Sequence, residues 1–203
     1  MFFLSKIADV IQIHPEKFNM RSEDALHENI NTKYANKVIQ GLGLCISLWD
    51  ICWASEGLCD VYTGLCNVNV EFRMVVFRPF EGEVLQARIV SQTEEGIHLT
   101  VGFFDDIFVP GSELADGAQF RPDPDSNGKA TWVVDLEEDD EKLYYDNHEM
   151  VHFSVLSEEW HDQTPTGPVE AEADPADQQL LPPYKIIGTM NAPGLGVCLW
   201  WQE

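Results

Sequence analysis

The stretch that decides the fold reads Gly82-Glu83-Val84-Leu85-Gln86-Ala87-Arg88-Ile89-Val90. We interpret it as a β-strand. A short hairpin signal at residues 94–96 leads to a second apolar run at residues 97–101, and a third strand-like run covers residues 103–110. The order strand, turn, strand, turn, strand predicts a β-meander.

Strand-like segments continue to the end of the chain. Strands are expected at residues 130–136 and 150–156, and a final hairpin is expected to join residues 184–190 to residues 197–201. Residues 162–183 are rich in Pro, Thr, Ala and Asp and are expected to be a mobile loop. Five to six short strands, with a meander first and a long loop before the last pair, predict a barrel of the oligonucleotide-binding (OB) type.

The first half of the chain mixes strand and helix signals. A strand is expected at residues 2–13, and alternation of apolar and polar side chains predicts another at residues 68–77. Residues 23–39 are predicted to be a helix, because four apolar side chains recur at four-residue spacing. These side chains are Leu26, Ile30, Tyr34 and Val38.

The remaining elements complete an α+β fold class. A strand at residues 43–51 and a loop at residues 52–66 precede the strand at residues 68–77, and Arg78-Pro79-Phe80 marks a domain joint. We therefore predict an N-terminal domain at residues 1–80 and an OB-type domain at residues 81–203.

Charge is divided unevenly between these two domains. Residues 1–80 hold seven Lys/Arg and nine Asp/Glu, whereas residues 81–203 hold five Lys/Arg and twenty-six Asp/Glu, so the net charges are −2 and −21. Tight binding to a phosphate backbone depends mainly on Lys and Arg contacts. Any contact with nucleic acid is therefore expected to be local, weak or supported by a partner.

Targeting and membrane signals are not found. The N-terminus lacks a basic region before an apolar run, and the most apolar uncharged stretch, residues 41–49, is too short to span a bilayer. We expect a soluble intracellular protein without membrane contact. Four of the five cysteines recur every seven residues, and we expect free, mostly buried thiols rather than a zinc site or disulfides. These four are Cys45, Cys52, Cys59 and Cys66.

Catalytic signatures are also missing, and no catalytic residue, metal ligand or cofactor is predicted. Gly41-Leu42-Gly43 lacks the third glycine of a dinucleotide-binding loop and precedes a strand. His148 and His152 fall in strand-like sequence, about 13 Å apart by strand rise. Asp105 and Asp106 could hold a metal for a hydrolase or nuclease, but no third ligand is close in sequence, so a strand-edge turn is the preferred interpretation.

Aromatic side chains indicate a binding function more clearly. OB barrels hold single strands by stacking bases on exposed rings in a basic groove. The candidate rings are Phe103, Phe104, Trp132, Tyr144 and Tyr145, and the candidate phosphate ligands are Arg88, Arg121 and Lys129. The acidic run at residues 135–141 could meet a basic partner or be a solvated hairpin tip. Trp200 and Trp201, in a predicted strand, would face opposite sides, one buried and one exposed.

Several segments taken together resemble one known family. They are residues 35–39, 41–46, 75–80, 102–107, 164–168 and 193–196 with Trp200-Trp201. In this order they resemble the S1-domain stalk subunit of eukaryotic RNA polymerase III, the counterpart of the seventh subunit of RNA polymerase II and of the archaeal E subunit. The resemblance covers essentially the whole chain.

The resemblance implies an RNP-like "tip" domain followed by an S1-type OB barrel. It implies a heterodimer with the small helical stalk subunit, anchoring to the polymerase core beside the clamp, and contact with initiation factors. A nuclear location and a part in initiating transfer RNA, 5S rRNA and other short RNAs follow from it, with weak contact to the nascent RNA. A free-standing S1-type protein that binds single-stranded RNA is the alternative.

Two sets of candidate site residues result. The first comes from matching the family's segments, and the second comes from the aromatic and basic side chains of the barrel domain, of which Phe103 and Phe104 also lie in a matching segment. The core- and partner-docking candidates are Gly41, Leu42, Gly43, Leu44, Phe77, Arg78, Pro79 and Phe80. The RNA-contact candidates are Arg88, Phe103, Phe104, Arg121, Lys129 and Trp132. The acidity of the barrel domain departs from that of a nucleic-acid-binding S1 domain.

Overall fold

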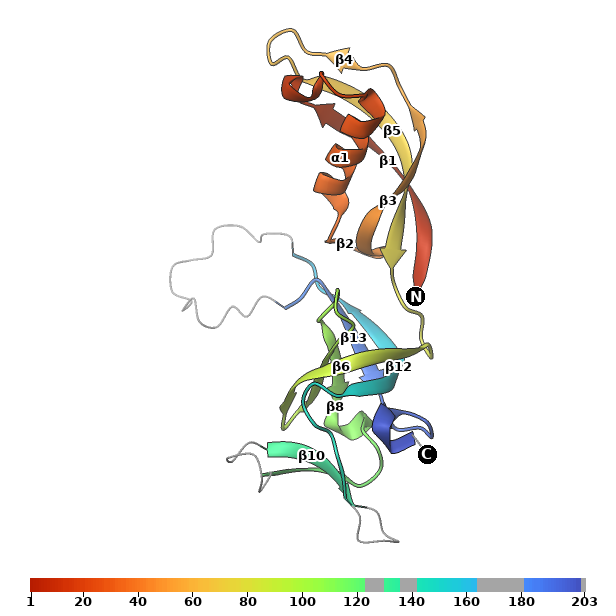
Figure 1. Ribbon diagram of the computed structural model, residues 1–203, viewed down its shortest axis with the longest axis vertical. Coiled ribbons are helices and arrows are strands. Elements are labelled where there is room, and N and C mark those ends of the chain that lie inside the picture. Colours follow the sequence, from red (N-terminus) through yellow and green to blue (C-terminus); the bar gives the residue numbers. More distant parts are fainter. Residues whose placement is uncertain (123–129, 136–141, 164–180, 202–203) are drawn as a thin grey trace, which may run out of the picture. The chain divides into compact units, whose positions relative to one another are not determined.

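The computed structural model describes residues 1–122, 130–135, 142–163 and 181–201 (Figure 1). The chain divides into two compact units, Met1–Pro79 and Phe80–Glu203, one residue before the predicted boundary. Lys129, residues 136–141 of the acidic run and residues 164–180 of the predicted loop lie outside the described residues. Within the described residues, no helix is both long and apolar enough to cross a membrane.

The N-terminal unit is an antiparallel sheet with one helix. The strand order is β1 (Phe2–Ile13), β5 (Cys66–Phe77), β3 (Gly43–Ala54) and β2 (Lys37–Ile39), and β4 (Leu58–Cys59) pairs with β5. Helix α1 (Ser22–Tyr34) follows the short 3-10 helix η1 (Pro15–Lys17) and lies on one side of the sheet (Figure 1). This unit accordingly has the predicted α+β character.

Alternation along β5 builds the core of this unit. Val70, Phe72 and Met74 are buried on the side that faces α1, because successive strand residues point to opposite faces. The helix contributes Ala25, Leu26 and Ile30 to the same core.

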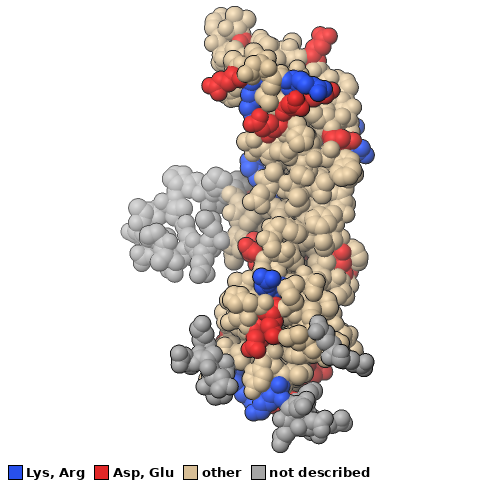
Figure 2. Space-filling view, viewed as in Figure 1, with Lys and Arg blue, Asp and Glu red and all other residues tan. Residues whose placement is uncertain are grey.

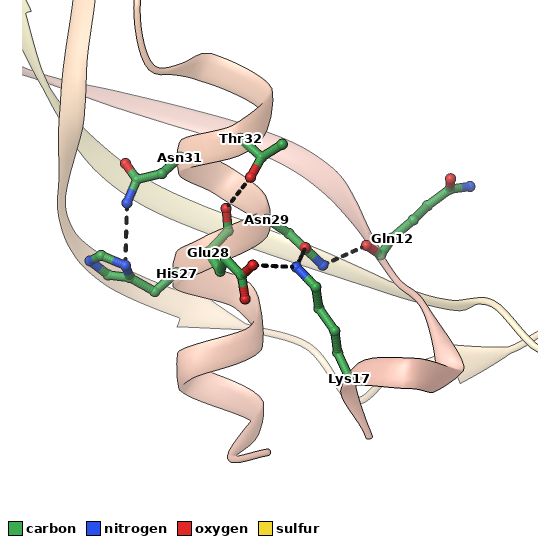
Figure 3. Close-up of polar contacts among 7 residues, drawn as sticks. All are labelled: Gln12, Lys17, His27, Glu28, Asn29, Asn31 and Thr32. Atoms are coloured by element: carbon green, nitrogen blue, oxygen red, sulfur yellow. Dashed lines mark hydrogen bonds and ion pairs between the residues drawn. The ribbon is translucent and has the colours of Figure 1, made fainter. Parts of the chain in front are cut away.

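Two asparagines of α1 attach the helix to β1 and β3, the strands on either side of β5. The Asn29 side chain donates a hydrogen bond of 2.9 Å to the backbone carbonyl of Gln12 in β1 and accepts one of 2.7 Å from Lys17 Nζ (Figure 3). Lys17 also pairs with Glu28 at 3.0 Å. On the other side, Asn31 Oδ1 accepts a 2.8 Å hydrogen bond from the Leu48 N–H of β3. These bonds fix the helix across the strands that it covers.

The predicted helix over residues 23–39 is wrong at its C-terminal end. The backbone leaves the helical region at Ala35, and Asn36 takes a left-handed conformation with φ of 59°, which asparagine tolerates better than most residues. Val38 then pairs with Leu44 as part of β2 instead of continuing the helical stripe. The predicted loop at residues 52–66 is also too long, since β3 continues to Ala54 and β4 lies within it.

The C-terminal unit is a closed five-stranded barrel. The ring runs β6 (Val84–Thr93), β7 (Gly96–Thr100), β8 (Ile107–Pro110), β13 (Tyr184–Thr189) and β12 (Met150–Trp160), and β12 pairs back onto β6. Only the β8–β13 pair among the described strands is parallel. Alternate residues of β6, including Leu85, Ala87 and Ile89, fill the interior. This is the predicted OB-type barrel.

A second small sheet lies between β8 and β12 in the sequence. It contains β9 (Ala118–Pro122), β10 (Ala130–Asp135) and β11 (Lys142–Tyr144), and the 3-10 helix η2 (Gly111–Glu113) precedes it. Two predicted strands are shorter than expected. Of residues 103–110 only Ile107–Pro110 pair, and residues 197–201 form β14 (Gly196–Val197) and a 3-10 helix, η3 (Cys198–Trp201). The predicted final hairpin is wrong, since β14 pairs with β12.

Candidate functional site

The face of the N-terminal sheet opposite α1 exposes apolar side chains. We call it the open face, and it comprises Leu4, Lys6, Val10, Asp50, Trp53, Glu71 and Arg73. Leu4, Val10 and Trp53 are exposed, Trp53 by 53%. Trp53 is placed on this face by its register with Glu71, which is the neighbour of the buried Phe72. Trp53 also borders a groove of about 530 Å³ beside the first turns of α1.

Ion pairs neutralise the charges on the open face. Lys6 Nζ lies 2.6 Å from Glu71 Oε2, and Arg73 forms a bidentate pair with Asp50. The hydrogen bond to Asp50 raises the pKa of Arg73, and the same bond lowers the pKa of Asp50. An exposed apolar surface with paired charges is typical of a protein interface rather than of a nucleic-acid site.

The eight docking candidates divide into buried and accessible residues. Gly43, Leu44, Phe77 and Pro79 are buried, Leu42 and Arg78 are half-buried, and Gly41 and Phe80 are exposed. Arg78 Nη1 donates a 2.8 Å hydrogen bond to the Gly41 carbonyl, so it holds the turn before β3 against the end of β5. A Cβ at Gly43 would lie 2.6 Å from the Phe77 carbonyl oxygen. The buried members thus maintain the backbone, and only the others can contact another chain.

The outer surface of the barrel gathers aromatic and basic side chains. We call it the barrel face, and it comprises Arg88, His98, Thr100, Phe108 and Lys185. His98 on β7 and Phe108 on β8 are direct partners, with ring centroids 4.8 Å apart. Lys185 on β13 places Nζ 4.7 Å from the Phe108 centroid. Rings beside cations are the combination that holds single-stranded nucleic acid in OB barrels.

Acidic groups border the barrel face and limit its positive charge. Burial raises the pKa of Asp106, and the neighbouring Asp105 raises it further. Burial and the nearby Lys185 lower the pKa of His98, so its neutral form is favoured. On the face drawn in Figure 2, Lys and Arg side chains are interspersed with Asp and Glu. Asp106 thus lies close to His98 and Lys185, two members of the barrel face.

The predicted RNA-contact residues differ in accessibility. Arg88 and Phe103 are exposed, but Phe104 and Trp132 are only 5% and 7% exposed, which removes their rings from any stacking surface. Trp132 donates its indole N–H to the Thr93 carbonyl at 2.9 Å and is a core residue. Arg121 is held by Asp135 at 2.6 Å.

Sequence reasoning missed His98, Phe108 and Lys185. The signal was present, because alternation in the predicted strands puts His98 and Phe108 on the solvent side between buried neighbours. The lateral pairing of the strands, which brings the three side chains together, was not visible.

Thiols and carboxylates form no metal site in the described part of the chain. No group of three His, Cys, Asp or Glu side chains there could hold a metal ion. Asp105 accepts a hydrogen bond from the Thr100 hydroxyl. All five cysteines are free, and only Cys45 is buried, so the expectation of mostly buried thiols is wrong. Cys59 and Cys66 are cross-strand partners.

The two terminal tryptophans lie in η3 and not in a strand, and the expectation that one is buried is wrong, because Trp200 is half-buried. The Trp200 ring packs edge-on against Tyr145 with centroids 4.8 Å apart. Trp201 is exposed and donates its indole N–H to the Leu195 carbonyl at 3.1 Å.

Comparisons with known proteins agree with this two-domain architecture. The sequence model of a family described as RNA polymerase III subunit Rpc25 matches residues 83–201. A second, described as the SHS2 domain found in the N terminus of Rpb7p/Rpc25p/MJ0397, matches residues 8–57. An SHS2 domain followed by an OB barrel, with these matches, defines the class as subunits of DNA-directed RNA polymerases.

Similar proteins narrow the class further. The DNA-directed RNA polymerase III subunit rpc8 of Schizosaccharomyces pombe is 40% identical over the whole of both chains. The subunits RPC8 of Bos taurus and of Saccharomyces cerevisiae are 37% and 34% identical, again over the whole of both chains. The chain belongs to the family of RNA polymerase III subunit Rpc25.

Proposed function

We propose that this chain is the non-catalytic stalk subunit of RNA polymerase III and acts in the nucleus. In this function it forms a heterodimer with the small helical stalk subunit, is anchored to the polymerase core beside the clamp, and assists initiation of transfer RNA, 5S rRNA and other short RNAs. The observation that carries the proposal is the match of the barrel domain to the Rpc25 family, preceded by a match to the SHS2 domain of Rpb7p, Rpc25p and MJ0397.

The open face is the best candidate for the helical partner. Its exposed Leu4, Val10 and Trp53 provide apolar area, and its charges are already paired within the sheet, so a partner need not supply counter-charges. An amphipathic helix has a suitable apolar stripe for such a surface.

Docking to the polymerase core would use a different set of residues. Gly41, Leu42 and Arg78 form an accessible turn in the N-terminal unit that the Arg78–Gly41 hydrogen bond holds in shape. Phe80, exposed in the C-terminal unit, is a further candidate. The acidic barrel domain would then meet basic surfaces of initiation factors and touch the nascent RNA weakly.

Recovery of polymerase subunits tests the proposal directly. Tagged chain, purified from nuclear extract and measured by mass spectrometry of intact complexes, is expected to carry one small helical protein and the subunits of RNA polymerase III. After the polymerase core is removed with salt, the heterodimer alone is expected to remain. Isolation as a monomer without polymerase subunits would contradict the proposal.

Contact with RNA is expected to depend on the barrel face. Phe108→Ala should weaken binding of a single-stranded RNA about tenfold, because base–aromatic stacking contributes on the order of 1–3 kcal/mol. Binding should be measured with the heterodimer at low salt, and affinity should fall as salt rises. Phe103→Ala is the matched variant, since Phe103 is an exposed phenylalanine that is not among the residues defining the barrel face.

The two variants separate the possible results. Loss with Phe103→Ala and none with Phe108→Ala would move the contact to the ring predicted from sequence. Tight, salt-sensitive binding by the monomer would instead favour the alternative, a free-standing S1-type RNA-binding protein.

A further inference from the structure

Two thiols face each other at the end of the N-terminal sheet. Cys59 of β4 and Cys66 of β5 are directly opposed in the antiparallel register. The next pair toward the turn is joined by a 2.8 Å hydrogen bond from the Asp60 N–H to the Leu65 carbonyl. Pairs alternate between hydrogen-bonded and non-hydrogen-bonded types, so Cys59 and Cys66 form the non-hydrogen-bonded type, in which side chains lie closer.

The surrounding residues hold the two sulfur atoms together. The neighbouring Cys59 raises the pKa of Cys66. Gly57 leaves room for the Cys66 sulfur, since a Cβ at that position would lie 2.4 Å from Cys66 Sγ. The turn is braced by Asp60, whose carboxylate accepts hydrogen bonds from the Thr63 hydroxyl at 2.7 Å and the Tyr62 N–H at 3.2 Å. The Cα separation of either type of antiparallel pair lies within the range of disulfides.

The pair is also accessible to a small reagent. Cys59 is exposed and Cys66 half-buried. Both line an open pocket of about 570 Å³ whose other walls include Phe18, Met20 and Leu26. Cys45, by contrast, is buried in the core and inaccessible.

We propose that Cys59 and Cys66 are a redox modification site, which a small-molecule disulfide such as oxidised glutathione converts into an intramolecular disulfide joining β4 to β5. The thiolate of the exposed Cys59 attacks one sulfur of the glutathione disulfide, whose S–S bond breaks and releases one glutathione thiolate. The Cys66 thiolate then attacks Cys59 Sγ and displaces the second glutathione.

The reaction balances without another reagent. The protein loses two electrons and two protons, and glutathione disulfide is reduced to two glutathione molecules. Cys59 is exposed and Cys66 is half-buried, which agrees with Cys59 reacting first. In a reducing compartment the pair stays as two thiols, and the disulfide forms only when the glutathione pool becomes oxidised.

Mass spectrometry of the full chain tests the site. Reduced protein is equilibrated with glutathione mixtures of rising oxidised fraction, alkylated, weighed intact and mapped by peptides. The intact chain is expected to lose two hydrogen atoms through one Cys59–Cys66 link. This form should exceed glutathione adducts at these thiols about tenfold, because the second thiol is already in place.

Variants and a control thiol decide the result. Cys59→Ser and Cys66→Ser should each abolish the link and leave a glutathione adduct on the remaining thiol. Cys52→Ser should leave the link unchanged, since Cys52 is an exposed thiol of β3 near Lys6 and Arg73. Independent glutathione adducts on Cys59 and Cys66 of the unaltered chain, a link to another cysteine, or no oxidation at all would overturn the proposal.

Discussion

Replacing Trp53 with alanine is expected to weaken binding of the small helical partner about thirtyfold or more. Truncating a large aromatic side chain at the centre of an interface commonly costs about 2 kcal/mol or more of binding free energy. Trp53 is 53% exposed and lies on the open face, so its ring can be covered by another chain. Titration of the purified partner by calorimetry measures the change.

A matched aromatic separates interface loss from general damage. Tyr62 is 98% exposed in the turn between β4 and β5 and lies off the open face. Tyr62→Ala should leave the affinity for the helical partner within about twofold, since the ring is almost fully exposed and lies away from the proposed interface. Both variants should unfold at the same urea concentration as the unaltered chain. Equal losses for Trp53→Ala and Tyr62→Ala, or no loss for Trp53→Ala, would rule out the open face as the docking surface.

Gly43→Ala is expected to destabilise the N-terminal unit by about 3 kcal/mol. Gly43 has a φ of 137°, a conformation that side chains rarely adopt, and a new Cβ would lie 2.6 Å from the Phe77 carbonyl oxygen and 2.8 Å from a Val76 methyl carbon. The carbonyl belongs to the backbone of β5 and cannot rotate away. Hydrogen exchange of β3 and β5 amides in the full chain measures the loss within this unit.

Gly41 is the matched control for this substitution. It also has a positive φ, 73°, but a Cβ there would meet no atom within 4 Å. Gly41→Ala should therefore cost only about 1 kcal/mol, the strain of the backbone conformation. If both substitutions cost the same, the close approach of β3 to the end of β5 is not what requires glycine at position 43. The two glycines thus have different roles, although both are docking candidates from sequence.

Much of the fold could be predicted because its signals are local. The alternation at residues 68–77 depends only on strand geometry, and it gives β5 with its buried Val70, Phe72 and Met74. Helix α1 was recognised from its apolar spacing, but its end was misplaced. Val38 satisfies the helical spacing equally well, and it is the pairing of Val38 with Leu44 that makes it part of a strand.

The candidate site was less predictable than the fold. Phe103, Phe104 and Phe108 are alike in sequence, yet Phe104 packs against Tyr184 inside the barrel with centroids 5.5 Å apart. Phe108 instead faces outward, between His98 and Lys185. Which ring is buried depends on how strands distant in sequence pair, and a local pattern does not contain that information.

The sequence by itself indicated the two domains, their strand-rich character and the excess of negative charge in residues 81–203, because composition and alternation survive without knowledge of pairing. It indicated the family through the resemblance of several segments in order along the chain. Only the tertiary structure decided the open face, the barrel face and the opposition of Cys59 to Cys66. Each of these surfaces is assembled from strands whose neighbours are chosen by register and long-range packing, and side chains become neighbours only when that register is set.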